Sequence, residues 1–191
     1  MRFITDFADL AVLLPLALCL GSGFAWQGWR RGVVAWAIAV VATLATMLTL
    51  KLMFVGCAAA LGGFSPSGHT SAGTVIYGGF IAIWLRRRGI PAVIALLPSA
   101  GAAAALIGAS RIAVSAHSLP EVAVGAVVGA AGVVLLLRLA GMPPAALRVG
   151  RLGAVVVVVM LLLHGLRLQV EPDIKALAGW LPARVCAAFE G

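Results

Sequence analysis

Two short polar segments of this sequence hold the residues whose types and spacing suit chemistry. The first is residues 65–69, Ser-Pro-Ser-Gly-His, which interrupts a long apolar run; the second is residues 110–121, with Arg111, His117 and Glu121. An arginine offers a forked, permanently charged donor to phosphate oxygens. An imidazole can transfer a proton or attack as a nucleophile. The two segments therefore predict a site for an anionic group such as phosphate.

The first segment has the pattern of a turn followed by a helix start. Pro66 and Gly68 favour a turn, and Ser67 suits the N-cap of a helix that begins near His69. The free N–H groups and positive dipole end of such a helix attract anions, to which His69 could give a proton. The alternative is an ordinary capped helix with an interfacial histidine, and this segment alone does not distinguish the two.

The second segment also supports two interpretations. His117 and Glu121 are four residues apart and can share one helix face. A carboxylate that accepts from one imidazole nitrogen fixes the tautomer and leaves the other nitrogen as a nucleophile. Ser118-Leu-Pro-Glu121 also matches a capping box, in which Glu121 only caps the helix. The two roles are compatible because a carboxylate has two oxygens.

The elements that must position these residues are membrane helices. The chain of 191 residues is 63% hydrophobic and 10% charged, with a mean hydropathy of +1.13. Soluble domains keep about a quarter of their residues charged. The basic residues are scattered at the ends of apolar runs, which argues against nucleic-acid binding. We therefore predict an all-α integral membrane protein with a bilayer as its partner.

Six apolar segments predict one compact bundle of about six transmembrane helices. They are Leu10–Trp26, Val33–Phe54, Thr70–Leu85, Ile90–Ala109, Leu119–Ala140 and Leu152–Leu168. Residues 1–191 are interpreted as a single domain. Its tail, residues 171–191, is expected to face outward and either lie on the membrane surface or cover the pocket.

The distribution of charge predicts the orientation. Alternate connections hold eight Lys and Arg residues on one side and six on the other, and all six acidic residues fall with the six. By the positive-inside rule the first set is cytoplasmic. In a bacterial cell the protein would lie in the inner membrane with its site loops facing the periplasm.

Ser-Gly-His followed by Ser-Arg, His and an acid at this spacing resembles the type 2 phosphatidic acid phosphatase superfamily, which includes lipid phosphatases and haloperoxidases. The resemblance covers Lys51 to Glu121 and implies a mechanism without metal or other cofactor. It implies that His117 attacks phosphorus to form a phosphohistidine, and that His69 protonates the leaving oxygen and later activates water.

The resemblance also implies which residues bind the phosphoryl oxygens. They are Arg111, Ser67, the Gly68 amide and Lys51, which begins the family's first motif. A substrate at the membrane surface would be a lipid phosphate or diphosphate of the outer leaflet, such as undecaprenyl diphosphate, phosphatidic acid, phosphatidylglycerophosphate or phosphorylated lipid A. The alternatives are a phosphotransferase between lipids and a non-catalytic lipid-binding or transport relative. The oligomeric state is left open.

The sequence departs from the family pattern in two motifs. Ala58 and Ala59 stand where the first motif has Arg-Pro, and Glu121 stands where the family usually has Asp. The phosphate pocket should therefore have one cation fewer, which leaves Lys51 and Arg111; Lys51 could instead be a snorkelling interfacial lysine. A further pair, Cys57 and Cys186, both face outward, and either form a disulfide or remain buried thiols.

Overall fold

The computed structural model describes residues 2–58, 64–180 and 186, and every regular element in these ranges is helical. The helices are α1 (Arg2–Asp6), α2 (Leu10–Trp26), α3 (Arg30–Gly56), α5 (Gly68–Gly73), the π-helical turn η1 (Thr74–Gly78), α6 (Gly79–Arg87), α7 (Ala92–Ala113), α8 (Leu119–Ala140), α9 (Val149–Leu163) and α10 (Glu171–Ala178). The predicted all-α class is confirmed.

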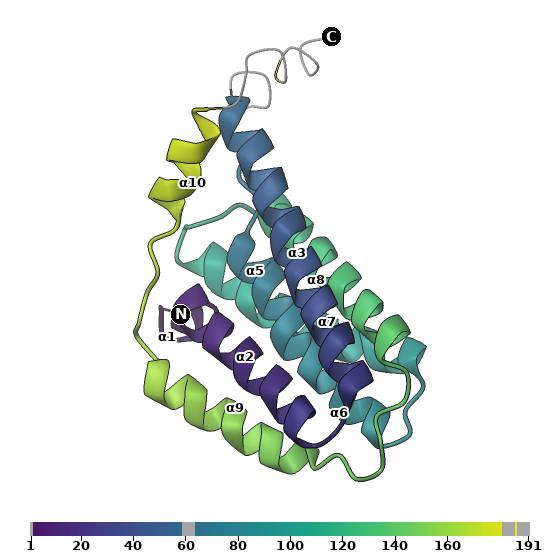
Figure 1. Ribbon diagram of the computed structural model, residues 1–191. Coiled ribbons are helices and arrows are strands. Elements are labelled where there is room, and N and C mark those ends of the chain that lie inside the picture. Colours follow the sequence, from purple (N-terminus) through teal and green to yellow (C-terminus); the bar gives the residue numbers. More distant parts are fainter. Residues whose placement is uncertain (1, 59–63, 181–185, 187–191) are drawn as a thin grey trace.

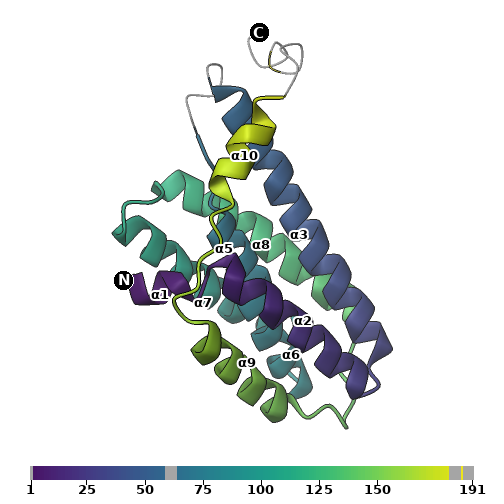
Figure 2. The same ribbon diagram turned by 60° about the vertical axis from the view of Figure 1, so that its left-hand side comes forward.

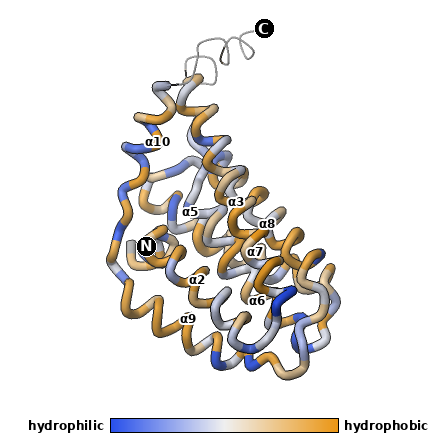
Figure 3. The backbone as a smooth tube through the Cα atoms, in the orientation of Figure 1, coloured by the Kyte–Doolittle hydropathy of each residue, from blue (hydrophilic) through white to orange (hydrophobic). Residues whose placement is uncertain are grey.

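Three of these helices, α3, α7 and α8, are long and apolar enough to cross a membrane, and α2 and α9 are shorter apolar helices. In Figure 3 apolar residues follow the length of the helices, while hydrophilic residues gather toward the connections and ends. Large apolar side chains such as Leu97, Leu161 and Leu162 are exposed, as lipid-facing residues are. The chain is a membrane protein, and its six-span arrangement stays a prediction.

The predicted bounds match the observed ones for α2 and α8 and differ for the other four segments, most at the C-terminal ends of α7 and α9. The segment expected at 90–109 begins after Pro91 and continues to Ala113, so Arg111 lies in the last turn of α7 rather than in a loop. Proline favours such a start because it lacks the N–H that a helix interior needs. The segment expected at 152–168 ends at Leu163, next to Gly165, whose φ of +85° breaks the helix.

The helices form a bundle in which α8 packs between α3 and α7 (Figures 1 and 2). Helix α9 lies along α2, and α10 lies beside the C-terminal end of α3 in both views. The bundle core holds Phe24, Trp36, Val75 and Leu136, all nearly or fully buried. Trp36 Nε1 donates a hydrogen bond to the Ala17 carbonyl at 2.9 Å, which ties α3 to α2.

Glycines on α8 bring α5 into backbone contact with it. A Cβ added to Gly125 would lie 2.5 Å from the Ser67 carbonyl oxygen, and one added to Gly129 would lie 2.7 Å from the Ser71 carbonyl oxygen. Only a residue without a side chain permits such an approach, as in other small-xxx-small faces. This contact holds residues 65–69 directly beside α8.

Candidate active site

Glu121 connects the two polar segments. Its Oε1 accepts a hydrogen bond from the Ser65 N–H at 2.7 Å, and its Oε2 accepts one from the Ser118 N–H at 2.8 Å. Its own carbonyl oxygen accepts from the Ser67 N–H at 3.0 Å. The capping box predicted for α8 is therefore present, and the second carboxylate oxygen binds the opposite loop.

His117 lies against this carboxylate. Its Nδ1 is 3.4 Å from Glu121 Oε2, and its side chain is only 10% exposed. The angle does not make this a hydrogen bond, and Nδ1 has no hydrogen-bond partner in the part of the chain that the structure describes. Burial lowers the pKa of His117, and the positive charges of Lys51 and Arg111 lower it further, against the opposing effect of Glu121. The lowered pKa favours the neutral form of the imidazole.

Ser67 is the N-cap of α5, as predicted. Its hydroxyl accepts from the Thr70 N–H at 3.4 Å and lies 2.9 Å from the Thr70 hydroxyl, inside a fully buried environment. The helical run that begins here continues through η1 and α6 to Arg87. The Ser67 side chain is thus engaged in capping, and neither it nor Gly68 lines the cavity beside the histidines.

Most of the predicted catalytic groups line one cavity of about 420 Å³. Its walls are formed by Val55, Ala58, Ser65, His69, Arg111, Ala116, His117, Glu121, Glu171 and Lys175. The fold therefore brings together His69 of α5, Arg111 of α7, His117 of the α7–α8 connection and Glu121 of α8. Arg111 is half-buried here, and its Nε is without a hydrogen-bond partner within the described ranges. A cavity with two imidazoles and a guanidinium suits a phosphate group.

Lys51 lies behind this cavity and is bound to a carboxylate. Its side chain is 7% exposed, and its Nζ is 2.7 Å from Glu171 Oε2. A Cβ on Gly68 would lie 3.4 Å from Lys51 Cε, so the lysine stem passes the start of α5. Burial raises the pKa of Glu171, but the hydrogen bond and charge of Lys51 outweigh it and lower the pKa. A snorkelling position does not fit a lysine that is itself buried and paired with Glu171.

His69 has a charged neighbour that the motifs do not contain. Its Nε2 lies 3.7 Å from Asp9 Oδ2, a distance that fits an ion pair but is too long for a hydrogen bond. Asp9 Oδ1 accepts from the N–H groups of Ala11 at 2.9 Å and Leu168 at 2.8 Å. Burial raises the pKa of Asp9, but His69 and these amides outweigh it, so the pKa is lowered. Asp9 is therefore an anion beside His69.

The chain beyond α10 is joined covalently to the end of α3. Cys57 and Cys186 form a disulfide with their Cα atoms 5.2 Å apart, which decides between the two alternatives left open by the sequence. Of the tail, α10 contributes Glu171 and Lys175 to the cavity wall. Ala59 and residues 181–185 and 187–191 lie outside the described residues.

Among the described residues, no group of three or more His, Cys, Asp or Glu side chains is placed to hold a metal ion. None of the side chains named above is therefore assigned to a metal.

Comparison with known families agrees with this arrangement. The model of the PAP2 superfamily matches residues 37–143, which is more than half of the chain and includes both polar segments. The chain belongs to the PAP2 superfamily. Members of this superfamily are generally phosphatases that act on phosphate esters. No match was found among curated proteins or among solved structures.

Three residues of the site region lie outside the part that matches the PAP2 superfamily. The sequence analysis did not predict them as site residues. They are Asp9, Glu171 and Lys175. Asp9 carried a local signal, because an Asp before an apolar helical run is a typical N-cap. That signal predicts a cap and not a partner for His69. Nothing in the spacing of Glu171 or Lys175 pointed to Lys51 or to the cavity.

Proposed function

We propose that this chain is a phosphatase that hydrolyses the phosphate ester or diphosphate of a membrane lipid. The observation that carries the proposal is the single cavity onto which His117, His69 and Arg111 open, with Glu121 beside His117. A nucleophile, a proton donor and a cation around one space are the groups that phosphoryl transfer needs.

In the first step, His117 Nε2 attacks phosphorus in line with the leaving oxygen. Glu121 faces Nδ1, which favours the proton on Nδ1 and leaves the Nε2 lone pair for phosphorus. As the N–P bond forms, the P–O bond breaks and His69 gives its proton to the leaving oxygen. The Asp9 carboxylate lies 3.7 Å from His69 Nε2, beside the ring that gives this proton.

In the second step, water attacks the phosphohistidine. His69, now neutral, takes a proton from the water as its oxygen bonds to phosphorus and the P–N bond breaks. Inorganic phosphate leaves, and both histidines return to their starting forms. Arg111 balances the charge of the phosphoryl oxygens in both steps, which is the main electrostatic demand of such a transfer.

The position of the site in the bundle supports a lipid substrate. The cavity lies at the C-terminal ends of α3 and α7 and the start of α8, so a headgroup can enter while its tails stay beside apolar helices. The acidic residues Asp9, Glu121 and Glu171 lie at this end, and Arg86, Arg87 and Arg88 lie at the other. The positive-inside rule then favours a periplasmic site in a bacterial inner membrane.

Phosphate release from a lipid panel tests the proposal. The panel contains phosphatidic acid, phosphatidylglycerophosphate, undecaprenyl diphosphate and phosphorylated lipid A, each with and without a chelator. We expect the wild type to release phosphate from at least one lipid, and His117→Ala to lower the rate by about 10³-fold or more. Unchanged turnover by His117→Ala would refute the mechanism. Radiolabel on an acceptor lipid instead of free phosphate would identify a phosphotransferase.

A further inference from the structure

Helix α10 places two charged side chains at the substrate cavity. Glu171 and Lys175 are four residues apart on one face of α10, and both line the cavity that holds the two histidines. The helix packs against α3, and the Cys57–Cys186 disulfide joins the chain beyond it to the end of α3. Figures 1 and 2 both show α10 beside the C-terminal end of α3.

The two charges have opposite relations to an incoming phosphate. The Glu171 carboxylate forms an ion pair with Lys51, with Oε2 2.7 Å from Nζ. It therefore takes up an ammonium group that could otherwise bind a phosphoryl oxygen. Lys175 is exposed and stands at the cavity wall as a cation in addition to Arg111. The chain has alanine at positions 58 and 59, so a second cation cannot come from that stretch.

We propose that α10 is part of the substrate site. Lys175 binds the substrate phosphate as the second cation, and Glu171 holds Lys51 until the phosphate displaces it. This inference rests on the proposed lipid phosphatase function and adds the residues that set affinity for the phosphate group. Both residues lie outside residues 37–143, so they belong to this chain's own C-terminal segment and not to the matched PAP2 region.

Variants of the two residues should change substrate affinity in opposite directions. Lys175→Ala should raise the KM for the lipid phosphate about tenfold with a smaller effect on kcat, and Lys175→Arg should restore the wild-type KM. Glu171→Gln should lower the KM several-fold, because the neutral amide competes less well for Lys51. Asp173→Asn is the matched control on the same helix, since Asp173 is exposed and does not line the cavity.

Binding of a nonhydrolysable phosphonate analogue of phosphatidic acid gives a readout that needs no turnover. The Kd should follow the same order as the KM: weakest for Lys175→Ala and tightest for Glu171→Gln. An unchanged Kd in Lys175→Ala would overturn the role of Lys175, and a weaker Kd in Glu171→Gln would overturn the role of Glu171. If the Kd values of the wild type and the variants follow this order, yet the wild type releases no phosphate from any lipid, the phosphatase proposal fails and the α10 inference stands.

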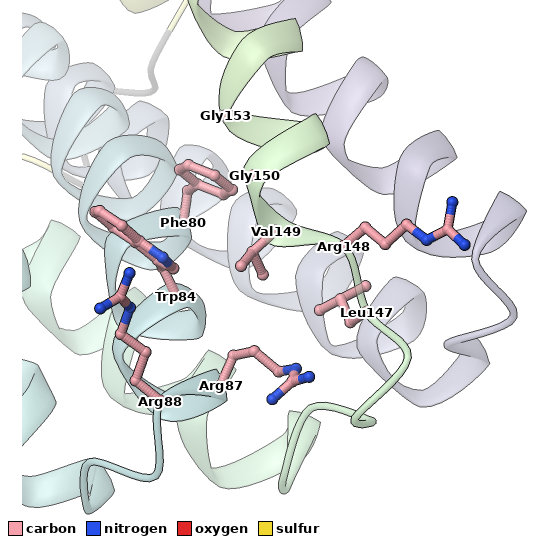
Figure 4. Close-up of a pocket in the computed structure, with 9 residues that line it drawn as sticks. All are labelled: Phe80, Trp84, Arg87, Arg88, Leu147, Arg148, Val149, Gly150 and Gly153. Carbon is pink, nitrogen blue, oxygen red and sulfur yellow. The ribbon is translucent and has the colours of Figure 1, made fainter.

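A second cavity, at the opposite end of the bundle, carries an independent inference. This cavity of about 610 Å³ lies between α6 and the start of α9 (Figure 4). It is lined by Phe80, Trp84, Arg87, Arg88, Leu147, Arg148, Val149, Gly150 and Gly153. Three arginines and no carboxylate line it, next to two aromatic rings.

The walls of this second cavity are suited to a lipid headgroup above an apolar chain. Arg88 stacks on Trp84 with its Cζ 5.2 Å from the ring centroid, an arrangement typical of a membrane interface. A Cβ on Gly150 would meet no atom within 4 Å, and one on Gly153 would lie 3.9 Å from Phe80 Cζ, so these two glycines of α9 leave room along the cavity that they line. Basic pockets of this kind between membrane helices bind anionic phospholipid headgroups.

From this charge complementarity we infer that the second cavity binds an anionic phospholipid of the surrounding bilayer. Native mass spectrometry of the protein with phosphatidylglycerol or phosphatidylcholine measures this binding. We expect phosphatidylglycerol to remain bound preferentially, and the preference to be lost in Arg87→Gln/Arg88→Gln. Gly150→Leu, which fills the space without removing charge, should lower binding as well.

Arg138→Gln is the matched control, since Arg138 is exposed and does not line this cavity. Equal loss in Arg138→Gln, or full binding in Gly150→Leu, would show a general charge effect and overturn the site. Displacement of the lipid by millimolar inorganic phosphate would show that the cavity binds free phosphate and not a lipid, which also overturns it.

Discussion

Asp9, the N-cap of α2, lies beside His69 at the start of α5, with 3.7 Å between Asp9 Oδ2 and His69 Nε2. Asp9 also caps α2 and accepts a hydrogen bond from the Leu168 N–H. One carboxylate thus anchors two backbone segments and supplies a negative charge beside the proposed proton donor. The segment that precedes α2 and holds Asp9 is therefore part of the site region, although it lies before the matched PAP2 region.

Replacing Asp9 by Asn should separate its charge from its capping role, because Asn is an equally good N-cap. We expect kcat of Asp9→Asn to fall about tenfold on alkyl lipid phosphates and less on an aryl phosphate, whose leaving group needs little protonation. His69→Ala should show the same selectivity with a larger loss. Steady-state kinetics on the alkyl and aryl phosphates measure this difference in kcat loss for each variant. Equal losses on both would argue against a general acid.

The pH dependence of kcat/KM should report the free His117. Burial and the charges of Lys51 and Arg111 lower its pKa below the usual 6.5. The neutral, nucleophilic form therefore persists to lower pH than in a free imidazole, and activity should fall only as pH decreases through a midpoint below 6.5. Arg111→Lys keeps the charge and should leave this acidic limb in place. An acidic limb centred above 6.5 would contradict the assignment.

Gly125→Ala should damage both stability and activity. Its new Cβ would meet the Ser67 carbonyl oxygen at 2.5 Å, which forces the segment that carries His69 away from α8. Overpacking of this kind costs about 1–3 kcal/mol. Thermal unfolding in detergent and phosphate release should both be affected. The control is Gly101→Ala, whose Cβ meets no atom within 4 Å and which should be neutral or slightly stabilising.

Shortening Glu121 to the family's usual Asp should lower activity here. The longer side chain reaches the Ser65 N–H at 2.7 Å and the Ser118 N–H at 2.8 Å at once, and it also faces His117. We expect Glu121→Asp to lose one of these hydrogen bonds, at a cost of about 1.5–3 kcal/mol for a bond to a charged group. Phosphate release and the melting temperature should both fall. A gain in activity would mean that the present loop geometry is not adapted to Glu.

Local sequence patterns were sufficient for much of the site. Ser67 caps α5 because a serine before an apolar helical run has that tendency. His117 and Glu121 do meet, but not on one helix face as predicted, because α8 begins at Leu119 and His117 lies in the connection before its N-cap, Ser118. The membrane class followed from composition. These features depend on neighbours in sequence, so periodicity and residue type could predict them.

Long-range packing decided the rest. The chain segments that bring Asp9 to His69, and Glu171 to Lys51, are distant in sequence, and no local pattern records which of them meet in the fold. The Cys57–Cys186 pair was one of two alternatives until the end of α3 and the tail were placed together. The sequence alone determined a membrane-helical chain and predicted two segments that could bind phosphate. Only the tertiary structure decided which charges surround them, because those contacts depend on how the helices pack.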